Sequence, residues 1–150
     1  MLPSGYLQSV VRALSGKLGW KRAIVLPLEE TLLDYLGTVL PPEIGESVKS
    51  QLKEVNLVQR IHTRRTECNY YKIEWGKADL DRERLLDVGP GDVKLATIRF
   101  ETESGLRQVV EVHVVNGVLF SLNFGGRMEK HLNSRVGQIL KCSTSQGADG

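Results

Sequence analysis

The sequence predicts an α+β domain in which N-terminal helices precede an antiparallel sheet. Three observations support this. Apolar residues recur at helical spacing between residues 6 and 58, they alternate at strand spacing over 67–75, and residues 93–124 contain two hairpin turn signals between β-rich runs. With 150 residues, 41% of them hydrophobic and 25% charged, the chain has the size and composition of one domain. We therefore expect a single domain over residues 1–142, followed by a disordered tail over 143–150.

Three helices are expected ahead of the sheet. The first spans about residues 6–18, the second begins at Pro27, and the third follows Pro41-Pro42, because a proline in the first turn of a helix sacrifices no hydrogen bond. The third helix ends either near Asn56 or after His62. Their expected buried stripes are Leu7, Val10, Val11, Leu14 and Leu18; Leu28, Leu32, Leu36, Val39 and Leu40; and Ile44, Val48, Leu52, Val55 and Val58.

The first 28 residues leave two interpretations open. They hold four basic and no acidic residues, a composition typical of organelle targeting segments as well as of a basic helix face. Apolar residues follow directly, and no small-residue cleavage pattern is present, which favours a structural helix over a targeting segment.

The sheet is expected to contain three antiparallel strands over about 93–102, 106–115 and 118–124. Glu103-Ser104-Gly105 suits a three-residue hairpin loop, and Asn116-Gly117 suits a two-residue type I′ turn. A fourth strand is expected over about 67–75, where apolar and charged side chains alternate. The sheet is thus a meander of three to four strands. A short helix within 127–141 is expected to close the domain, because Met128, Leu132 and Val136 recur at a spacing of four. The polar segment 77–92 leaves room for another short helix around Leu80–Leu86.

The two turns set the expected register, because side chains alternate strictly along a strand. Thr102 then faces Leu106 and Val115 faces Val118. The remaining cross-strand pairs are counted outward from these two. One face carries a core floor of Ala96, Ile98, Phe100, Val110, Val112, Val114 and Leu119. The other face carries an apolar row of Val118, Phe120, Leu122 and Phe124. Such a row would expose more apolar surface than monomers usually tolerate, so we expect a cover or a homodimer interface over it.

The same register gathers four polar residues on the second face: Thr97, Arg99, Glu111 and His113. Thr97 lies opposite Glu111, and Arg99 lies diagonal to it. If the face is covered, Arg99 could clamp an anion while Glu111 and His113 act as an acid/base pair. The plainer interpretation, which we favour, is an internal ion pair beside a histidine at the rim of a sheet.

A second candidate site is basic. Arg60, Arg64 and Arg65 precede Tyr70 and Tyr71, and mixtures of basic and aromatic residues are typical of nucleic-acid binders. A solvated helix end explains the same residues, because cations are favoured there by the helix dipole. The chain carries a net charge of only +2 and contains no recognised nucleic-acid motif, so nucleic acid is an unfavoured partner.

Several kinds of chemistry have no support in the sequence. Neither cysteine lies in a C-x-x-C pair, and the three histidines share no metal-ligand spacing, so we expect two free thiols, no metal and no cofactor. Nucleotide-binding and esterase signatures are missing. The apolar runs are too short to span a bilayer, and a cytoplasmic protein is expected.

These observations favour a non-catalytic binding or protein-interaction module, with a homodimer through the apolar row as its simplest form. The first alternative is a small enzyme or ligand-binding domain with a covered pocket around Arg99, Glu111 and His113. The second is an anion or nucleic-acid binder that uses Arg60, Arg64 and Arg65.

Overall fold

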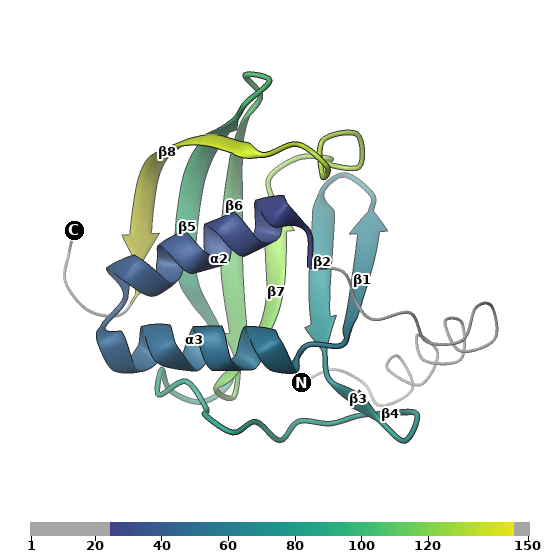
Figure 1. The fold of residues 1–150 in the computed structure, drawn as a ribbon, viewed down its shortest axis with the longest axis vertical. Helices are drawn as coiled ribbons and strands as arrows, with labels where there is room; N and C mark the ends of the chain where they lie inside the picture. Colours follow the sequence, from purple (N-terminus) through teal and green to yellow (C-terminus); the bar gives the residue numbers. More distant parts are fainter. Residues whose placement is uncertain (1–24, 146–150) are drawn as a thin grey trace.

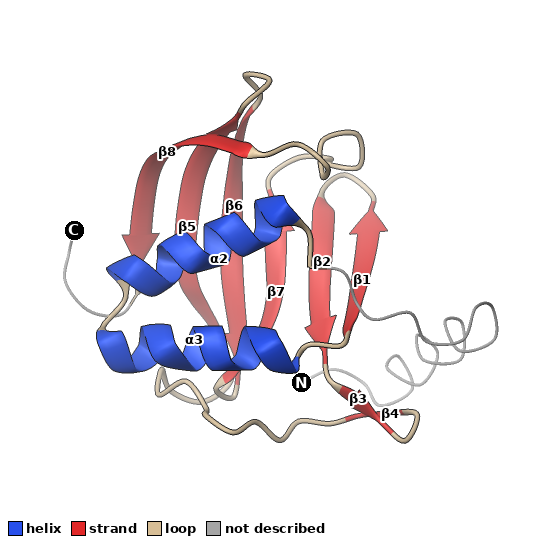
Figure 2. Ribbon diagram, viewed as in Figure 1, coloured by secondary structure: helices blue, strands red, loops and turns tan. Residues whose placement is uncertain are grey.

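The protein forms two layers, with a pair of helices packed on one face of an antiparallel sheet (Figures 1 and 2). A computed structural model describes residues 25–145. The α+β class and the antiparallel sheet are as expected, but the sheet has six strands, in the order β1-β2-β7-β6-β5-β8. The first expected helix, over residues 6–18, lies outside the described residues.

The two helices are α2 (Pro27–Val39) and α3 (Pro42–Glu54), each with a proline in its first turn. Leu28, Leu32 and Leu36 are fully buried, as their spacing predicts. Val39 was expected on the same stripe but is 39% exposed. The helices meet at two glycines, since a Cβ added to Gly45 would lie 2.5 Å from the carbonyl oxygen of Gly37.

The strands of the main sheet are β1 (Leu57–His62), β2 (Thr66–Tyr71), β5 (Asp92–Thr102), β6 (Arg107–Val115), β7 (Val118–Phe124) and β8 (Val136–Thr144). A separate small hairpin consists of β3 (Ile73–Glu74) and β4 (Lys77–Ala78) and projects from the lower edge of the domain in Figure 1. The sheet is therefore not a simple meander, because β2 pairs with β7 and β8 returns to the far side of β5.

Both short helices expected after residue 76 are wrong. Residues 79–91 form an irregular segment in which Leu86 and Val88 are buried anchors. Residues 136–144 form β8, and Met128 and Leu132 are buried within turns just before it. The spacing of four between Met128 and Leu132 suggested a helix, but it arises because each residue is buried separately in an irregular segment. Helix α3 ends at Glu54, the earlier of its two expected ends, and β8 extends to Thr144, into the segment expected to be a tail.

The expected register is confirmed between β5 and β6, where Thr97 pairs with Glu111 and Phe100 with Gln108. The turn at Asn116-Gly117 also forms as expected, with Val115 opposite Val118. All seven residues of the expected core floor are at most 2% exposed.

The register between β6 and β7 is not the expected one, because β7 contains a bulge at Phe120. Val114 pairs with Leu119 but His113 pairs with Ser121, which leaves Phe120 as an extra residue between them. Leu122 and Phe124 therefore point to the helix side, opposite Val112 and Val110, and are fully buried. The expected row of Val118, Phe120, Leu122 and Phe124 on one face is wrong, since one inserted residue reverses every side chain beyond it.

Candidate functional site

The face of the sheet that the helices leave uncovered carries the predicted polar residues. Glu111 and His113 do lie together, with 3.4 Å between Glu111 Oε1 and His113 Nε2. Arg99 is exposed and pairs across the strands with Val109 rather than contacting Glu111. The cation beside Glu111 is instead Lys94, whose Nζ lies 3.7 Å from Glu111 Oε2.

The cluster around His113 is open to water rather than enclosed. His113 Nδ1 lies 3.2 Å from Asp92 Oδ1, and the side chain of Asp92 is 66% exposed. Lys94 is also more than half exposed. Ion pairs in such surroundings are screened and contribute little. Sequence reasoning missed Asp92 and Lys94 because a second bulge, between Lys94 and Ala96, brings these two residues to the outer face.

The predicted basic site is divided between two environments. Arg60 on β1 points to the helix side, where its Nη2 lies 2.6 Å from Oε1 of the fully buried Glu29. Arg64 and Arg65 are exposed in the turn between β1 and β2 and border a shallow groove. Tyr70 and Tyr71 are buried, so neither ring is presented beside these arginines.

Glu29 organises a buried polar corner between α2, β1 and β2. Its carboxylate accepts hydrogen bonds from the backbone amide of Leu26 and from Arg60. Burial, followed by the charge of Glu29, raises the pKa of Cys68 and of Tyr70. The thiol of Cys68 is thereby kept protonated, which makes it a poor nucleophile. Cys142 is the second free cysteine, so both thiols are unpaired as expected.

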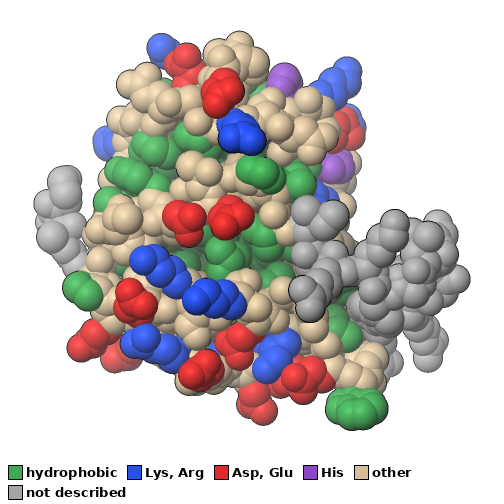
Figure 3. Space-filling view, in the orientation of Figure 1, with side chains coloured by type: hydrophobic (Ala, Val, Ile, Leu, Met, Phe, Trp, Pro, Cys, Tyr) green, Lys and Arg blue, Asp and Glu red, His purple; other side chains and the backbone are tan. Residues whose placement is uncertain are grey.

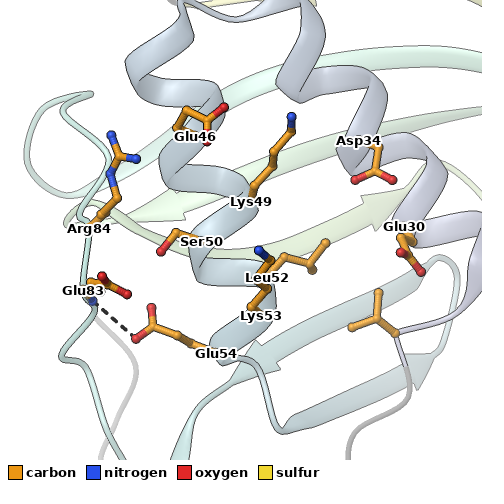
Figure 4. A pocket seen from close by; sticks show the side chains of 11 residues that line it. Glu30, Asp34, Glu46, Lys49, Ser50, Leu52, Lys53, Glu54, Glu83 and Arg84 are labelled. Carbon is orange, nitrogen blue, oxygen red and sulfur yellow. Dashed lines mark hydrogen bonds between the residues drawn. The ribbon is translucent and has the colours of Figure 1, made fainter.

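A groove of about 670 Å³ lies between the two helices and the loop after β4 (Figure 4). Glu30 and Asp34 on α2 face Lys49 on α3, within the mixed charges that cover the helix side of the molecule (Figures 3 and 4). The groove is further lined by Val25, Glu46, Ser50, Leu52, Lys53, Glu54, Glu83 and Arg84. Five of its side chains are carboxylates and three are cationic, so the groove is acidic.

The most unusual side chain of the described residues is Trp75, at the tip of the β3–β4 hairpin. It is 100% exposed, although tryptophan has one of the largest apolar surfaces of any residue. Trp75 and Gly76 form the two-residue turn, with φ values of +53° and +74°. A bulky residue at positive φ is strained, and turns of this kind favour asparagine, aspartate or glycine instead. Among residues 25–145, no packing contact offsets the strain at Trp75.

The base of this hairpin is held firmly. The side-chain amide of Asn56 donates to the carbonyl oxygen of Ile73 at 2.9 Å, and its Oδ1 accepts from the amide of Ile73 at 2.7 Å. The side chain of Asn56 thus makes the two backbone hydrogen bonds with Ile73 that a neighbouring strand would otherwise make. Ile73 packs with Leu57 and Tyr71 in a small second core. The tip is therefore presented on a fixed support.

Charged residues complete the base. Lys72 Nζ lies 3.6 Å from a carboxylate oxygen of each of Glu54, Glu74 and Asp79. Although partial burial opposes the charge of Lys72, these carboxylates raise its pKa. The pKa of Asp79 is lowered, chiefly by a hydrogen bond from the amide of Asp81 and also by the charge of Lys72.

The alternation of Tyr71, Ile73 and Trp75 predicted a strand over about 67–75. Tyr71 and Ile73 are buried, but the chain turns at Trp75, whose ring is exposed. The signal that could have revealed this is Gly76, because a glycine second in a two-residue turn is a hairpin indicator.

The chain matches no family model, no curated protein and no solved structure.

Among residues 25–145, no group of three His, Cys, Asp or Glu side chains is arranged to hold a metal ion. None of the helices that the structure describes has the length and apolar character needed to cross a membrane.

Proposed function

We propose that the protein is a protein-interaction module whose main contact is the tip of the β3–β4 hairpin. The observation that carries the proposal is the complete exposure of Trp75 on a strained turn. Tryptophan is among the residues most enriched at the energetic centres of protein interfaces, where its ring is desolvated on binding. A strained residue that does not contribute to packing is best explained by a role in binding another molecule.

The construction of the hairpin supports the same function. Its base is fixed by Asn56, by the buried Ile73 and by the charge cluster around Lys72. A side chain on a rigid support loses less conformational entropy on binding than one on a mobile loop. The remaining exposed large apolar residues of the described chain are Val39, Leu80, Leu85 and Leu140, and each is at most 64% exposed.

Site-specific photo-crosslinking tests the proposal. A benzophenone amino acid at position 75 should crosslink a discrete partner in extracts of cells that express the protein, whereas the same group at Val39 or Leu140 should not. Excess unlabelled wild-type protein should suppress the adduct, and excess Trp75→Asn protein should not, because asparagine suits the turn but lacks the ring. Equal labelling from all three positions would rule the module out. An adduct with twice the mass of the chain would identify the partner as a second copy.

A further inference from the structure

We infer that the partner presents a basic segment, with an arginine or lysine side chain stacked on the face of Trp75. This inference rests on the proposed function and specifies its partner. Cations are attracted to the face of an aromatic ring, and tryptophan binds them best. The ring of Trp75 is fully exposed, so a cation can reach it.

The charges around Trp75 favour a cation over other ligands. Lys72 is shared by the carboxylates of Glu54, Glu74 and Asp79, and Lys77 is the cross-strand partner of Glu74, so three negative charges face two positive charges at the hairpin. The side chain of Glu74, next to Trp75, is 52% exposed and can pair with a bound cation. From residue 73 to residue 87 the chain carries five acidic and three basic side chains, whereas the whole chain has a net charge of +2.

The acidic surface continues from the hairpin into the groove of Figure 4. Glu54 belongs to both, because its carboxylate contacts Lys72 and also accepts a hydrogen bond from the amide of Glu83 in the groove wall. The groove itself has five carboxylates against three cations. An extended basic segment anchored at Trp75 would therefore meet further carboxylates along the loop after β4.

This charge pattern also argues against a lipid surface as the occupant. Anionic headgroups attract basic segments and are repelled by carboxylates such as Glu74 and Asp79. A tryptophan that inserts into such a membrane is normally accompanied by lysine or arginine, and here acidic residues exceed basic ones.

The test uses the full chain carrying Trp20→Phe, which leaves Trp75 as its only tryptophan. The probe is a fluorescein-labelled peptide of alternating glycine and arginine, and its matched control has citrulline, a neutral isostere, at every arginine. The arginine peptide should raise fluorescence anisotropy and shift the emission of Trp75 on binding, with affinity falling as salt rises. The citrulline peptide should not bind.

Substitutions assign the binding to this surface. Trp75→Asn should weaken it about tenfold, the loss expected for a cation–π contact that becomes partly desolvated. Glu74→Gln should weaken it about threefold, as for an exposed ion pair. Glu103→Gln, an exposed carboxylate in the loop between β5 and β6, should leave it unchanged.

Three results would overturn the inference. They are equal binding of the citrulline peptide, unchanged affinity of the Trp75→Asn protein, and a Trp75 emission shift caused by phosphatidylcholine/phosphatidylserine vesicles or by raising the protein concentration alone. If crosslinking at position 75 succeeds while the arginine peptide fails to bind, the interaction module stands and only the basic partner is rejected. Failure of both experiments rejects both.

Discussion

Two hairpin turns in this protein share one backbone geometry and differ in almost everything else. Asn116-Gly117 and Trp75-Gly76 both have positive φ at their two central residues. The first turn is packed into the domain: the carbonyl oxygen of Gly117 accepts hydrogen bonds from the amide of Leu86 and from the side chain of Gln51. At the second turn, a Cβ added to Gly76 would have no atom of the described residues within 4 Å, apart from those of its own chain neighbours.

The comparison separates what a turn contributes to folding from what it contributes to function. Asn116 suits the left-handed conformation, and its Oδ1 also accepts a hydrogen bond from the amide of Gly91. Trp75 is disfavoured in the same conformation, and within the part of the chain that the structure describes it has no packing to offset the strain. At Asn116 the residue type suits the backbone conformation that the fold requires, whereas at Trp75 it does not. Such a conflict is expected where a residue is retained for binding.

The largest contrast should come from adding one methyl group to each turn. A Cβ at Gly117 would lie 2.9 Å from the carbonyl oxygen of Leu86, in addition to the strain at φ +80°. We expect Gly117→Ala to lower the free energy of unfolding by about 3 kcal/mol. Gly76→Ala meets only backbone strain and should cost about 1 kcal/mol. Urea denaturation of both variants measures the difference, and equal losses would contradict the packed-versus-open distinction.

A somewhat smaller contrast is expected from the two side-chain amides that hold the turns. Gln51 donates to the carbonyl oxygens of Arg84 and Gly117 and accepts from the amide of Leu119. Gln51→Leu leaves the buried amide of Leu119 without its acceptor and removes one donor each from the carbonyl oxygens of Arg84 and Gly117, so it should lower the free energy of unfolding by about 2–3 kcal/mol. Asn56→Ala frees the hairpin base, so it should chiefly reduce hydrogen-exchange protection at Ile73. A global loss from Asn56→Ala as large as that from Gln51→Leu would show that the hairpin is integral to the core.

Exchanging the residue at the strained position should give a small effect of opposite sign. Trp75→Asn relieves the strain and removes no packing, so we expect a gain of about 0.5 kcal/mol in the free energy of unfolding. Thermal melting detects such a gain, and Trp75→Phe, which keeps a bulky ring at positive φ, is the matched control. A clear loss of stability in Trp75→Asn would mean that the ring packs against the domain after all.

The weakest effect is expected from acid, and only at one turn. The pKa of Asp79 lies below its usual value of 3.8, so its charge supports the hairpin base above that pH, and the support is lost as the pH falls through the lowered pKa. Between pH 5 and pH 3 the exchange protection factor of the Asp79 amide, which donates to the carbonyl oxygen of Lys72, should fall. The amides of Leu86 and Leu119, held by neutral acceptors, should keep theirs. A parallel fall at all three amides would indicate general acid unfolding.

Much of the fold follows from local rules in the sequence. The prolines at 27 and 42 mark where α2 and α3 begin, and Leu28, Leu32 and Leu36 occupy the buried stripe that helical spacing predicts. The turn at Asn116-Gly117 and the register between β5 and β6 also follow, because turn type determines which residues face each other.

The strands at the sheet edges could not be predicted in the same way. β8 is exposed along most of its length and lacks a regular alternation, since it pairs on one side only and its register with β5 shifts twice. β1 continues the apolar spacing of α3 through Val55 and Val58, so periodicity alone cannot show where the helix gives way to a strand.

The candidate site was missed for a related reason. Alternation predicted a strand that continues to Trp75, whereas the backbone reverses at Trp75-Gly76 and leaves the ring exposed. Of the predicted polar cluster, Thr97, Glu111 and His113 do share a face, but Arg99 makes no contact with Glu111 and Lys94 takes its place. The positions of the bulges depend on how neighbouring strands pair, so the sequence pattern of a single strand does not predict them.

The extra residue in β7 also bears on how the chain can change in length. Leu119 and Ser121 oppose consecutive residues of β6, so the ladder closes without Phe120. A deletion at Phe120 would leave every other side chain of the strand on its present side, at the expense of the edge-to-face contact with Tyr71. The loss of any residue from Ser121 to Asn123 would instead oblige the ladder to absorb the change at the bulge or expose core leucine to water. Phe120 is thus the position at which this strand can gain or lose a residue while the interior is preserved.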